Sequence, residues 1–482
     1  MKRLHNIGDS RNGTEVLALD KRKKILLLSD DLRMSSGVAT ISRELVMGTV
    51  HQFNWIQLGA AKKHPEQGKF YDLSEDVLSN TGVPDPYVKV LPWSGYGNMD
   101  VLRQLINMEN PDAILHFTDP RYWQWLYDGE HEIRQNVPIF FYAIWDNLPI
   151  PMYNRPYYKS CDWVGAISKQ TYGIVKNLIQ REDYSTWKAN EDWQVSYVPH
   201  GINTDTYKKV EVPQEFKERI LGKGRDYDFI LYWSNRNIKR KQPGDVIYAF
   251  KLFREQLPEE QRDHVALLMH TQPKDPNGTD LYKVHADLAP ECNVIFSESR
   301  LDQIELNYLY NLADCTINIA GNEGFGLTTA ESVMAETMMI TNVTGGLQDQ
   351  CGFSWLSNGE LVTAEEYVKL GSLHDRDEWK YKVSWGDWVY PIWSRVRTLS
   401  GSVPTPYIWD DKVDVKEVAD VIHEVYRLTP SERNERGKKG REAFIQKLGL
   451  SHENMTKQLT YGMNTAIEKW TPRKRYELFK LK

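Results

Sequence analysis

Short apolar segments recur along the whole chain, separated by longer amphipathic or polar stretches. Each segment is nearly continuous in apolar residues, which is typical of strands buried on both faces. Their alternation with helical patterns predicts parallel sheets in a doubly wound α/β architecture. The predicted strands are Ile25–Ser29, Trp55–Leu58, Ala113–Phe117, Pro138–Trp145, Trp163–Ser168 and Ser196–Pro199 in the first half, and Asp228–Ser234, Val265–His270, Asn293–Phe296, Cys315–Ala320 and Met338–Thr341 in the second.

The strand series starts again near Asp228, after a polar stretch at residues 203–225 that has the composition of a linker. A chain of 482 residues also exceeds the roughly 250–300 residues at which a single core stops growing. We therefore predict two Rossmann-like domains that face each other across a cleft. The predicted units are an N-terminal extension at 1–23, a first domain at 24–210, a second domain at 211–450, and a C-terminal helical segment at 451–482 that crosses back to the first domain.

The alternation of strands and helices fails between Phe353 and Asp411, a stretch that carries six of the sixteen tryptophans. A loop of this length without structure of its own is uncommon in a compact domain. We predict an ordered, Trp-rich insertion at about 353–412 in the second domain. Its tryptophans could stack on the flat faces of ring-shaped ligands such as sugars or bases, or they could form the core of an added subdomain, which is the commoner role.

Composition places the chain among globular proteins, with 41% hydrophobic and 26% charged residues. The net charge of −6 argues mildly against a protein that binds nucleic acid by electrostatics alone. No run of apolar residues is long enough to span a membrane, and the N-terminus has no signal-peptide pattern. Four cysteines without a CxxC pair are typical of reduced thiols. We expect a cytoplasmic protein, in the host cytoplasm if a phage encodes it.

The strongest chemical signal is the sequence Asn-Glu-Gly-Phe-Gly-Leu-Thr-Thr-Ala-Glu-Ser at residues 322–332, which follows a predicted strand and begins a predicted helix. Glycines let backbone N–H groups approach a ligand, and a helix N-terminus attracts a phosphate. Glu323 and Glu331 flank this anion site, and carboxylates suit hydroxyl groups of a sugar or a ribose. A glycine-rich turn alone is more often a structural turn, so the pattern needs support from elsewhere.

That support is a resemblance to the retaining glycosyltransferases of family 4. Glu-Gly-Phe-Gly-Leu with a second glutamate at 331 resembles the E-x7-E signature of that family. Similar segments occur at residues 35–38, 161–168, 198–207, 233–241, 312–320 and 339–349, so the resemblance covers about residues 24–458. It implies the GT-B fold, with an acceptor domain followed by a donor domain, and sugar transfer from a nucleotide sugar without a metal ion or any other cofactor.

The resemblance also implies roles for individual residues. Arg236 and Lys241 match the pair that binds the donor diphosphate, Glu323 would orient the sugar ring, and Glu331 would bind the ribose. His116 matches a histidine that faces the donor sugar. The remaining donor-binding candidates are Gly37, Gly324, Phe325, Gly326, Leu327, Thr328 and Arg300. In this family the departing phosphate is thought to help deprotonate the acceptor on the same face of the sugar, which retains the anomeric configuration.

Other interpretations exist for several of these residues. His116 at a strand end could be a core histidine, Arg236 could belong to a solvated turn, and His200 is expected to stabilise the corner between the domains. The Asp-Asp pairs at 30–31 and 410–411 have no third ligand nearby in sequence, so we expect no metal site there. Ser-Glu-Ser-Arg at 297–300 replaces a glycine that usually precedes the nucleobase loop, which leaves the choice of base open.

The acceptor is the least determined part of the sequence-based hypothesis. We expect a nucleoside-diphosphate sugar, with a UDP-sugar as first choice, and a hydroxyl acceptor on a glycan or small carbohydrate. One alternative is an enzyme that glycosylates hydroxymethylated bases of phage DNA, which would have to reach a base within the duplex. Another is a GT-B sugar-binding protein without turnover, and the sequence fixes no oligomeric state.

Overall fold

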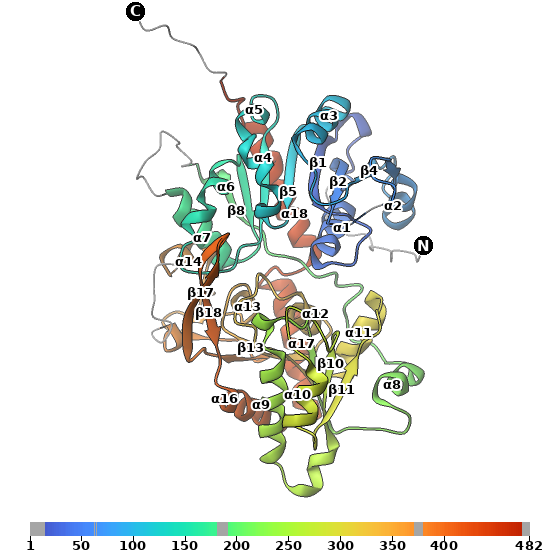
Figure 1. The fold of residues 1–482 in the computed structure, drawn as a ribbon, viewed down its shortest axis with the longest axis vertical. Coiled ribbons are helices and arrows are strands. Elements are labelled where there is room, and N and C mark those ends of the chain that lie inside the picture. Colours follow the sequence, from blue (N-terminus) through green and yellow to red (C-terminus); the bar gives the residue numbers. More distant parts are fainter. Residues whose placement is uncertain (1–14, 62, 64, 181–190, 371–378, 475–482) are drawn as a thin grey trace, which may run out of the picture.

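The computed structural model describes residues 15–61, 63, 65–180, 191–370 and 379–474. Figure 1 shows two α/β domains, one with blue to green colours and one with yellow to orange colours. Most of the predicted N-terminal extension and the last eight residues of the chain lie outside the described residues. Within the described part, no helix is both long enough and apolar enough to cross a membrane.

The first domain is built on a sheet with the strand order β3-β4-β2-β1-β5-β6-β7-β8. All neighbouring strands are parallel except β3, which runs antiparallel to β4. The strands are β1 (Lys23–Asp30), β2 (Phe53–Ala60), β3 (Tyr71–Asp72), β4 (Val88–Pro92), β5 (Ala113–Phe117), β6 (Ile139–Ala143), β7 (Trp163–Ala166) and β8 (Val195–Tyr197). Its helices are α1 (Gly37–Thr49), α2 (Ser74–Thr81), α3 (Met99–Glu109), α4 (Gln124–Asp128), α5 (Glu130–Ile133), α6 (Arg155–Lys159) and α7 (Lys169–Gln180).

The second domain has a parallel sheet with the order β11-β10-β9-β12-β13-β16. Its strands are β9 (Phe229–Ser234), β10 (Val265–His270), β11 (Asn293–Ser297), β12 (Cys315–Asn318), β13 (Met338–Asn342) and β16 (Val389–Ile392). The helices of this half of the chain are α8 (Gln214–Leu221), α9 (Pro243–Glu255), α10 (Leu281–Leu288), α11 (Gln303–Leu312), α12 (Leu327–Met334), α13 (Leu347–Gln350), α16 (Val415–Tyr426), α17 (Pro430–Gln446) and α18 (His452–Lys469), the last of which packs on the first domain.

The doubly wound α/β architecture predicted from the sequence is confirmed, and each of the eleven predicted strands is present. Except in the edge strands β8 and β11, their apolar side chains are buried on both faces, as a parallel sheet between two helical layers requires. Three strands of the two main sheets were not predicted, β3, β4 and β16. The predicted linker at residues 203–225 contains a helix, α8.

The insertion at 353–412 is ordered in its described part and contains more than an added subdomain. It includes β14 (Ser354–Trp355), β15 (Val383–Ser384), α14 (Ala364–Leu370) and the antiparallel hairpin of β17 (Val396–Ser402) and β18 (Thr405–Lys412). Strand β16 lies within the same stretch but belongs to the main sheet, where it pairs with β13. The insertion therefore consists of two parts, one before and one after a strand of the second domain's main sheet.

Aromatic rings form the interior of the insertion. Trp379 makes edge-to-face contacts with Phe353 and Trp355, and Phe353 also contacts Trp393. Trp379 and Trp393 are buried, whereas Trp385 is 41% exposed. The core role considered for these tryptophans thus agrees with their positions.

Three segments tie the second half of the chain to the first domain. Helix α14 packs along α7, the β17–β18 hairpin contacts the loop after β6, and α18 packs against α1 and β7. At the start of α18, a Cβ on Gly201 would lie 2.2 Å from the carbonyl oxygen of Ser451, so only glycine permits this backbone approach. Figure 1 shows α18 in red within the first domain, although most of the preceding helix, α17, lies with the second.

A buried ion pair joins α18 to α1. His452 Nδ1 lies 3.0 Å from Glu44 Oε2, and both side chains are largely removed from solvent. Burial opposes ionisation of both groups, but each partner outweighs it, so the pKa of Glu44 is lowered and the pKa of His452 is raised. The pair therefore favours the charged form of both residues.

We expect His452→Gln to destabilise the protein most between about pH 4.5 and 6.5, the usual pKa values of the two groups. The raised pKa of His452 gives stability that is complete below pH 6.5 and is lost as the pH rises through the folded-state value. The lowered pKa of Glu44 gives stability that is lost as the pH falls below 4.5. Breaking a buried pair typically costs about 3–5 kcal/mol. Urea unfolding at pH 5.5 and at pH 9 measures the difference in the free energy of unfolding between the wild type and the variant. This difference should be smaller at pH 9.

The double variant Glu44→Gln/His452→Gln is the matched control, because it removes both charges. The difference in the free energy of unfolding between the double variant and the single variant should show little pH dependence above pH 6.5. An equal loss of stability in His452→Gln at both pH values would contradict an ionic contribution from this contact.

Candidate functional site

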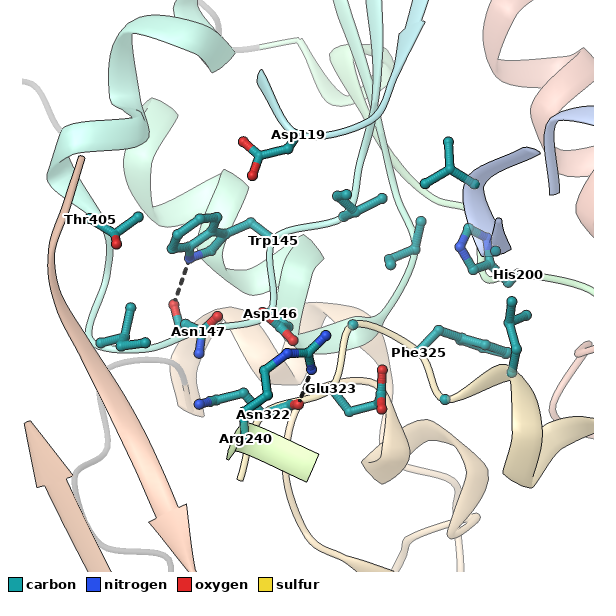
Figure 2. Close-up of a pocket in the computed structure, with 18 of the residues that line it drawn as sticks. Asp119, Trp145, Asp146, Asn147, His200, Arg240, Asn322, Glu323, Phe325 and Thr405 are labelled. Atoms are coloured by element: carbon teal, nitrogen blue, oxygen red, sulfur yellow. Dashed lines mark hydrogen bonds between the residues drawn. The ribbon is translucent and has the colours of Figure 1, made fainter. Parts of the chain in front are cut away.

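The carboxyl ends of both sheets border one cavity between the domains, with a volume of about 750 Å³. Parallel α/β sheets place their binding crevices at this edge. The first domain contributes residues that follow β1, β5, β6 and β7, and the second contributes residues that follow β9 and β12 together with the β17–β18 hairpin. Figure 2 shows the residues that line this cavity.

The loop between β12 and α12 is the part of the wall that the sequence predicted most clearly. Gly326 stands at the N-terminus of α12 with a φ of 89°, and a Cβ there would lie 2.5 Å from the Leu347 side chain. Thr328 Oγ1 donates a hydrogen bond to the carbonyl of Ser234 at 2.9 Å, which fixes α12 to the end of β9. The first amide groups of α12 are therefore held at the cavity, where they can bind an anion.

A second glycine turn, at residues 345–346, packs against this loop. The amide of Gly346 donates to the carbonyl of Glu323 at 2.9 Å, and the Gln350 amide group donates to the carbonyl of Phe325 at 2.6 Å. A Cβ on Gly345 would lie 1.9 Å from the Glu323 carbonyl, and its φ is 50°. The Gly-Gly sequence at 345–346 thus lets two loops pack backbone to backbone.

Glu323 in the cavity wall forms an ion pair with Lys241. Both side chains are buried, with 12% and 8% of their surface exposed. Burial opposes the ionisation of Glu323, but Lys241 and then Arg240 outweigh it, so the pKa of Glu323 is lowered. Glu323 is therefore a carboxylate that can accept hydrogen bonds from ligand hydroxyls.

Arg240 and Asp146 add charges from opposite domains. Arg240 donates a hydrogen bond to the carbonyl of Asn322 at 2.6 Å, and its guanidinium group lies beside Asp146 and Glu323 in Figure 2. Burial raises the pKa of Asp146 to about 6; Arg240 lowers it in part, and the nearby Glu323 adds to the rise. The two domains thus place opposite charges at a single point of the cleft.

Glu331 has a different environment from Glu323. Tyr310 donates a hydrogen bond to its carboxylate at 2.5 Å, and the hydroxyl of Tyr207 also supports it. Burial nevertheless dominates and raises the pKa of Glu331 to about 7. The group lies in the first two turns of α12 but outside the wall of the cavity itself.

The structure brings most of the predicted donor-binding residues to this cavity. The wall contains Gly37, Glu323, Gly324, Phe325, Gly326, Leu327 and Thr328. Lys241 reaches the cavity through its contact with Glu323. His200, expected at the corner between the domains, also lines the wall; it is within 2.9 Å of the Tyr142 hydroxyl and contacts the Phe325 ring.

Besides Glu331 and Lys241, three more predicted residues lie outside the wall. His116 is fully buried, its Nδ1 is 2.6 Å from the Tyr127 hydroxyl, and its ring stacks on Phe141 behind the cavity. Burial lowers the pKa of His116 to about 3, so the ring is neutral. Arg236 is 64% exposed and forms an ion pair with Asp275 at 2.7 Å, and Arg300 is exposed. In this arrangement His116 takes the position of a core histidine rather than one that faces a sugar.

Sequence reasoning missed several residues of the wall. Asp119 and Arg121 follow β5, and Trp145, Asp146 and Asn147 follow β6. The signal that could have identified them is their place directly after predicted parallel strands, where functional loops gather. Other unpredicted wall residues come from the turn at 239–240 and from the hairpin, namely Lys239, Arg240, Ser400, Thr405, Ile408, Asp410 and Lys412.

Two Rossmann-like domains that face each other across a cleft define the GT-B fold. No family model matches the chain, and no curated protein matches its sequence. Among solved structures, the chain is similar to Alr3699/HepE of Anabaena in complex with UDP and glucose, with 11% identity and a TM-score of 0.61 over 92% of this chain and 100% of the other. It is also similar to the sucrose-phosphate synthase tll1590 of Thermosynechococcus elongatus, with 14% identity and a TM-score of 0.62 over 93% and 100%.

A third similar structure is the trehalose-6-phosphate protein of E. coli bound with UDP-2-fluoro glucose, with 10% identity and a TM-score of 0.59 over 94% of this chain and 100% of the other. These likenesses extend over nearly the full chain, including both sheets. They establish the GT-B fold.

We expect Glu331→Gln to stabilise the protein above pH 7 and to have little effect near pH 4.5. A carboxyl group whose folded-state pKa is raised from 4.5 to about 7 weakens folding progressively as the pH rises through this range, and the full penalty remains above it. A shift of this size corresponds to at most about 3 kcal/mol. Thermal unfolding at pH 5 and pH 8 measures the gain.

Glu336→Gln is a suitable control, because this nearby glutamate directly follows α12, is partly exposed and does not line the cavity. The melting temperature of Glu331→Gln is compared with that of the wild type at each pH. The assignment would be contradicted if the variant were less stable than the wild type at pH 8 but not at pH 5. In that case the hydrogen bonds from Tyr310 and Tyr207 would outweigh the burial of the charge.

Proposed function

We propose that this protein is a retaining glycosyltransferase that moves a sugar from a nucleoside-diphosphate sugar to a hydroxyl acceptor. The observation that carries the proposal is the ionised Glu323, held by the buried Lys241 in a glycine-rich loop at the N-terminus of α12. This loop combines an acceptor for sugar hydroxyls with donors for a phosphate in one interdomain cavity.

The donor diphosphate would lie at the start of α12. The amides of Phe325, Gly326 and Leu327 are preorganised donors there, and Arg240 and Lys241 supply positive charge from the loop after β9. Such donors stabilise charge as it develops on a leaving diphosphate, because they need no reorganisation during the reaction. With these cations in place, the proposal requires neither a metal ion nor another cofactor. Arg236 could join them if it left Asp275.

Glu323 would orient the sugar ring through its hydroxyls, and Glu331 would bind the ribose. In the transfer, the bond between the anomeric carbon and the diphosphate oxygen breaks, and the acceptor oxygen bonds to the same face of that carbon. The acceptor proton passes to the departing diphosphate. No carboxylate has to form a covalent bond, which suits a Glu323 already engaged with Lys241.

A UDP-sugar is the first choice of donor, and the similar structures that hold UDP or a UDP-sugar support this choice. The acceptor is proposed to be a carbohydrate. No phosphate-binding track outside the cavity is needed for such an acceptor, in contrast to duplex DNA, which is bound largely through its backbone.

We expect UDP and one or more UDP-sugars to raise the melting temperature of the protein, and GDP and ADP to do so less. A ligand at 100 times its dissociation constant stabilises the folded state by about 2.7 kcal/mol. Glu323→Gln should lower sugar transfer at least tenfold, because the amide cannot replace the carboxylate as a double acceptor. It should also weaken UDP binding, because it leaves Lys241 buried without its charged partner. Thermal shift and a UDP-release assay measure the two effects.

Charge variants separate the roles of the cations. Arg240→Ala should weaken UDP binding about tenfold, and Arg236→Ala should do so only if Arg236 leaves Asp275 for the ligand. Arg103→Ala on α3 is the control, since this arginine pairs with Glu132 away from the cavity. If no nucleoside diphosphate or nucleotide sugar stabilises the wild type, the glycosyltransferase proposal fails and the sugar-binding alternative gains support.

A further inference from the structure

The cavity has a second end that the donor chemistry does not use. Figure 2 shows Phe325 and His200 on one side, with Glu323 near the centre, and Thr405, Trp145 and Asn147 on the other side. Phe325 and Glu323 belong to the donor loop. The far end is formed by the loops after β5 and β6 in the first domain and by the β17–β18 hairpin of the second.

Alternation along the hairpin divides its side chains into two sets. In β18 the even positions Ile408, Asp410 and Lys412 line the cavity, together with Ser400 of β17, which is paired with Ile408. Side chains at alternate positions point to opposite faces of a strand. From Tyr407 to Lys412 the odd positions therefore point away from the cavity, whereas Thr405, which lies beyond the register shift of the hairpin, lines it.

The odd positions hold the hairpin in place. The hydroxyl of Tyr407 accepts a hydrogen bond from the Met152 amide at 3.0 Å, and Tyr153 donates to the Tyr407 carbonyl at 2.8 Å. The Trp409 amide donates to the Leu148 carbonyl. A hairpin of the second domain is thus fixed on the first domain, and it covers the far end of the cavity.

The charged groups at this end compensate each other. Arg121 forms an ion pair with Asp119, and Lys412 lies 3.1 Å from Asp410. A polyanion would find no uncompensated cation in these two pairs, although phosphate binding depends on such cations. A neutral ligand with many hydroxyl groups would find acceptors and donors of both kinds.

Polar and aromatic groups for such a ligand are present. Ser400 and Thr405 present hydroxyl groups, and Asn147 Nδ2 and Asp410 Oδ1 are buried without a hydrogen-bond partner among the described residues. Trp145 is half-buried in the wall, with its indole N–H bonded to the Asn147 carbonyl. Aromatic rings with a few well-placed polar groups are typical of sites for small ring-shaped ligands.

Given the proposed glycosyltransferase function, we propose that the β17–β18 hairpin is the specificity-determining wall of the acceptor site. With Trp145 and Asn147 it binds a neutral carbohydrate of monosaccharide or disaccharide size, or the terminal ring of a longer glycan. The hairpin that covers the far end admits a chain end and excludes a continuous duplex. This inference rests on the proposed function but concerns the acceptor alone.

The experiment uses the full chain with a UDP-release assay. UDP-glucose, UDP-galactose and UDP-N-acetylglucosamine serve as donors, and methyl glucosides, methyl galactosides, methyl mannosides, maltose and lactose serve as acceptors. We expect acceptor-dependent UDP release from the wild type with at least one of these glycosides. Thr405→Trp, which fills the far end, should reduce that release at least tenfold through a higher KM for the acceptor, while UDP still stabilises the variant.

Val403→Trp is the matched control, because Val403 is 98% exposed at the turn of the same hairpin and does not line the cavity. It should behave as the wild type. Asp410→Asn guards against a folding defect in Thr405→Trp, since it changes no volume; it should raise the acceptor KM several-fold and leave UDP binding unchanged.

The outcomes separate this inference from the function on which it rests. Absence of UDP binding by the wild-type protein would refute the proposed donor site. UDP binding combined with equal acceptor use by the wild type and by both cavity variants would overturn the role of the hairpin. UDP binding without release in the presence of any glycoside, or release only with duplex DNA that contains 5-hydroxymethylcytosine, would overturn the carbohydrate assignment.

Discussion

The buried ion pair of Lys241 and Glu323 is the interaction on which the site depends. It connects the loop after β9 with the loop after β12, which are neighbours in the sheet but 82 residues apart in the chain. Either charge alone would be costly at this depth, because a buried ion without a partner is strongly unfavourable. The pair therefore fixes where the glycine-rich loop lies, and with it the direction of α12 and its amide groups.

The position of this pair relative to the first domain depends on how the two domains are held together. Helix α18 lies on the first domain, helix α14 packs on α7, and the hairpin packs on the loop after β6. These contacts come from three separate segments of the second half of the chain. They bring the carboxyl ends of both sheets to one cavity, so residues such as Asp146 and Arg240 meet although they belong to different domains.

The sequence predicted those features that depend on neighbouring residues. Continuous apolar runs identified strands that are buried on both faces, but β4 contains Lys89, and β16 contains Pro391 and is an edge strand, where proline is tolerated. The loop at 322–328 was predicted because its glycines and Glu323 are adjacent in sequence. The roles of Arg240 and of the hairpin were not, because their partners lie far away along the chain, as Met152 does from Tyr407. Spacing also could not show that the cations of the segment after β9 differ in position. Arg240 lines the cavity, Lys241 is paired with Glu323, and Arg236 lies outside the cavity wall.

The two glutamates of the E-x7-E pattern illustrate how environment assigns chemistry to equal residues. Glu323 has a lysine partner and is ionised, whereas Glu331 has only hydroxyl partners, and its burial raises its pKa to about 7. Pairs of titratable groups whose surroundings push their pKa values apart commonly have separate roles. A permanent carboxylate suits the sugar, whose hydroxyls need a fixed acceptor. A carboxyl group that titrates near neutral pH can instead gain its charge when ligand hydroxyls donate to it, so part of the ligand's binding energy would offset the burial of that charge.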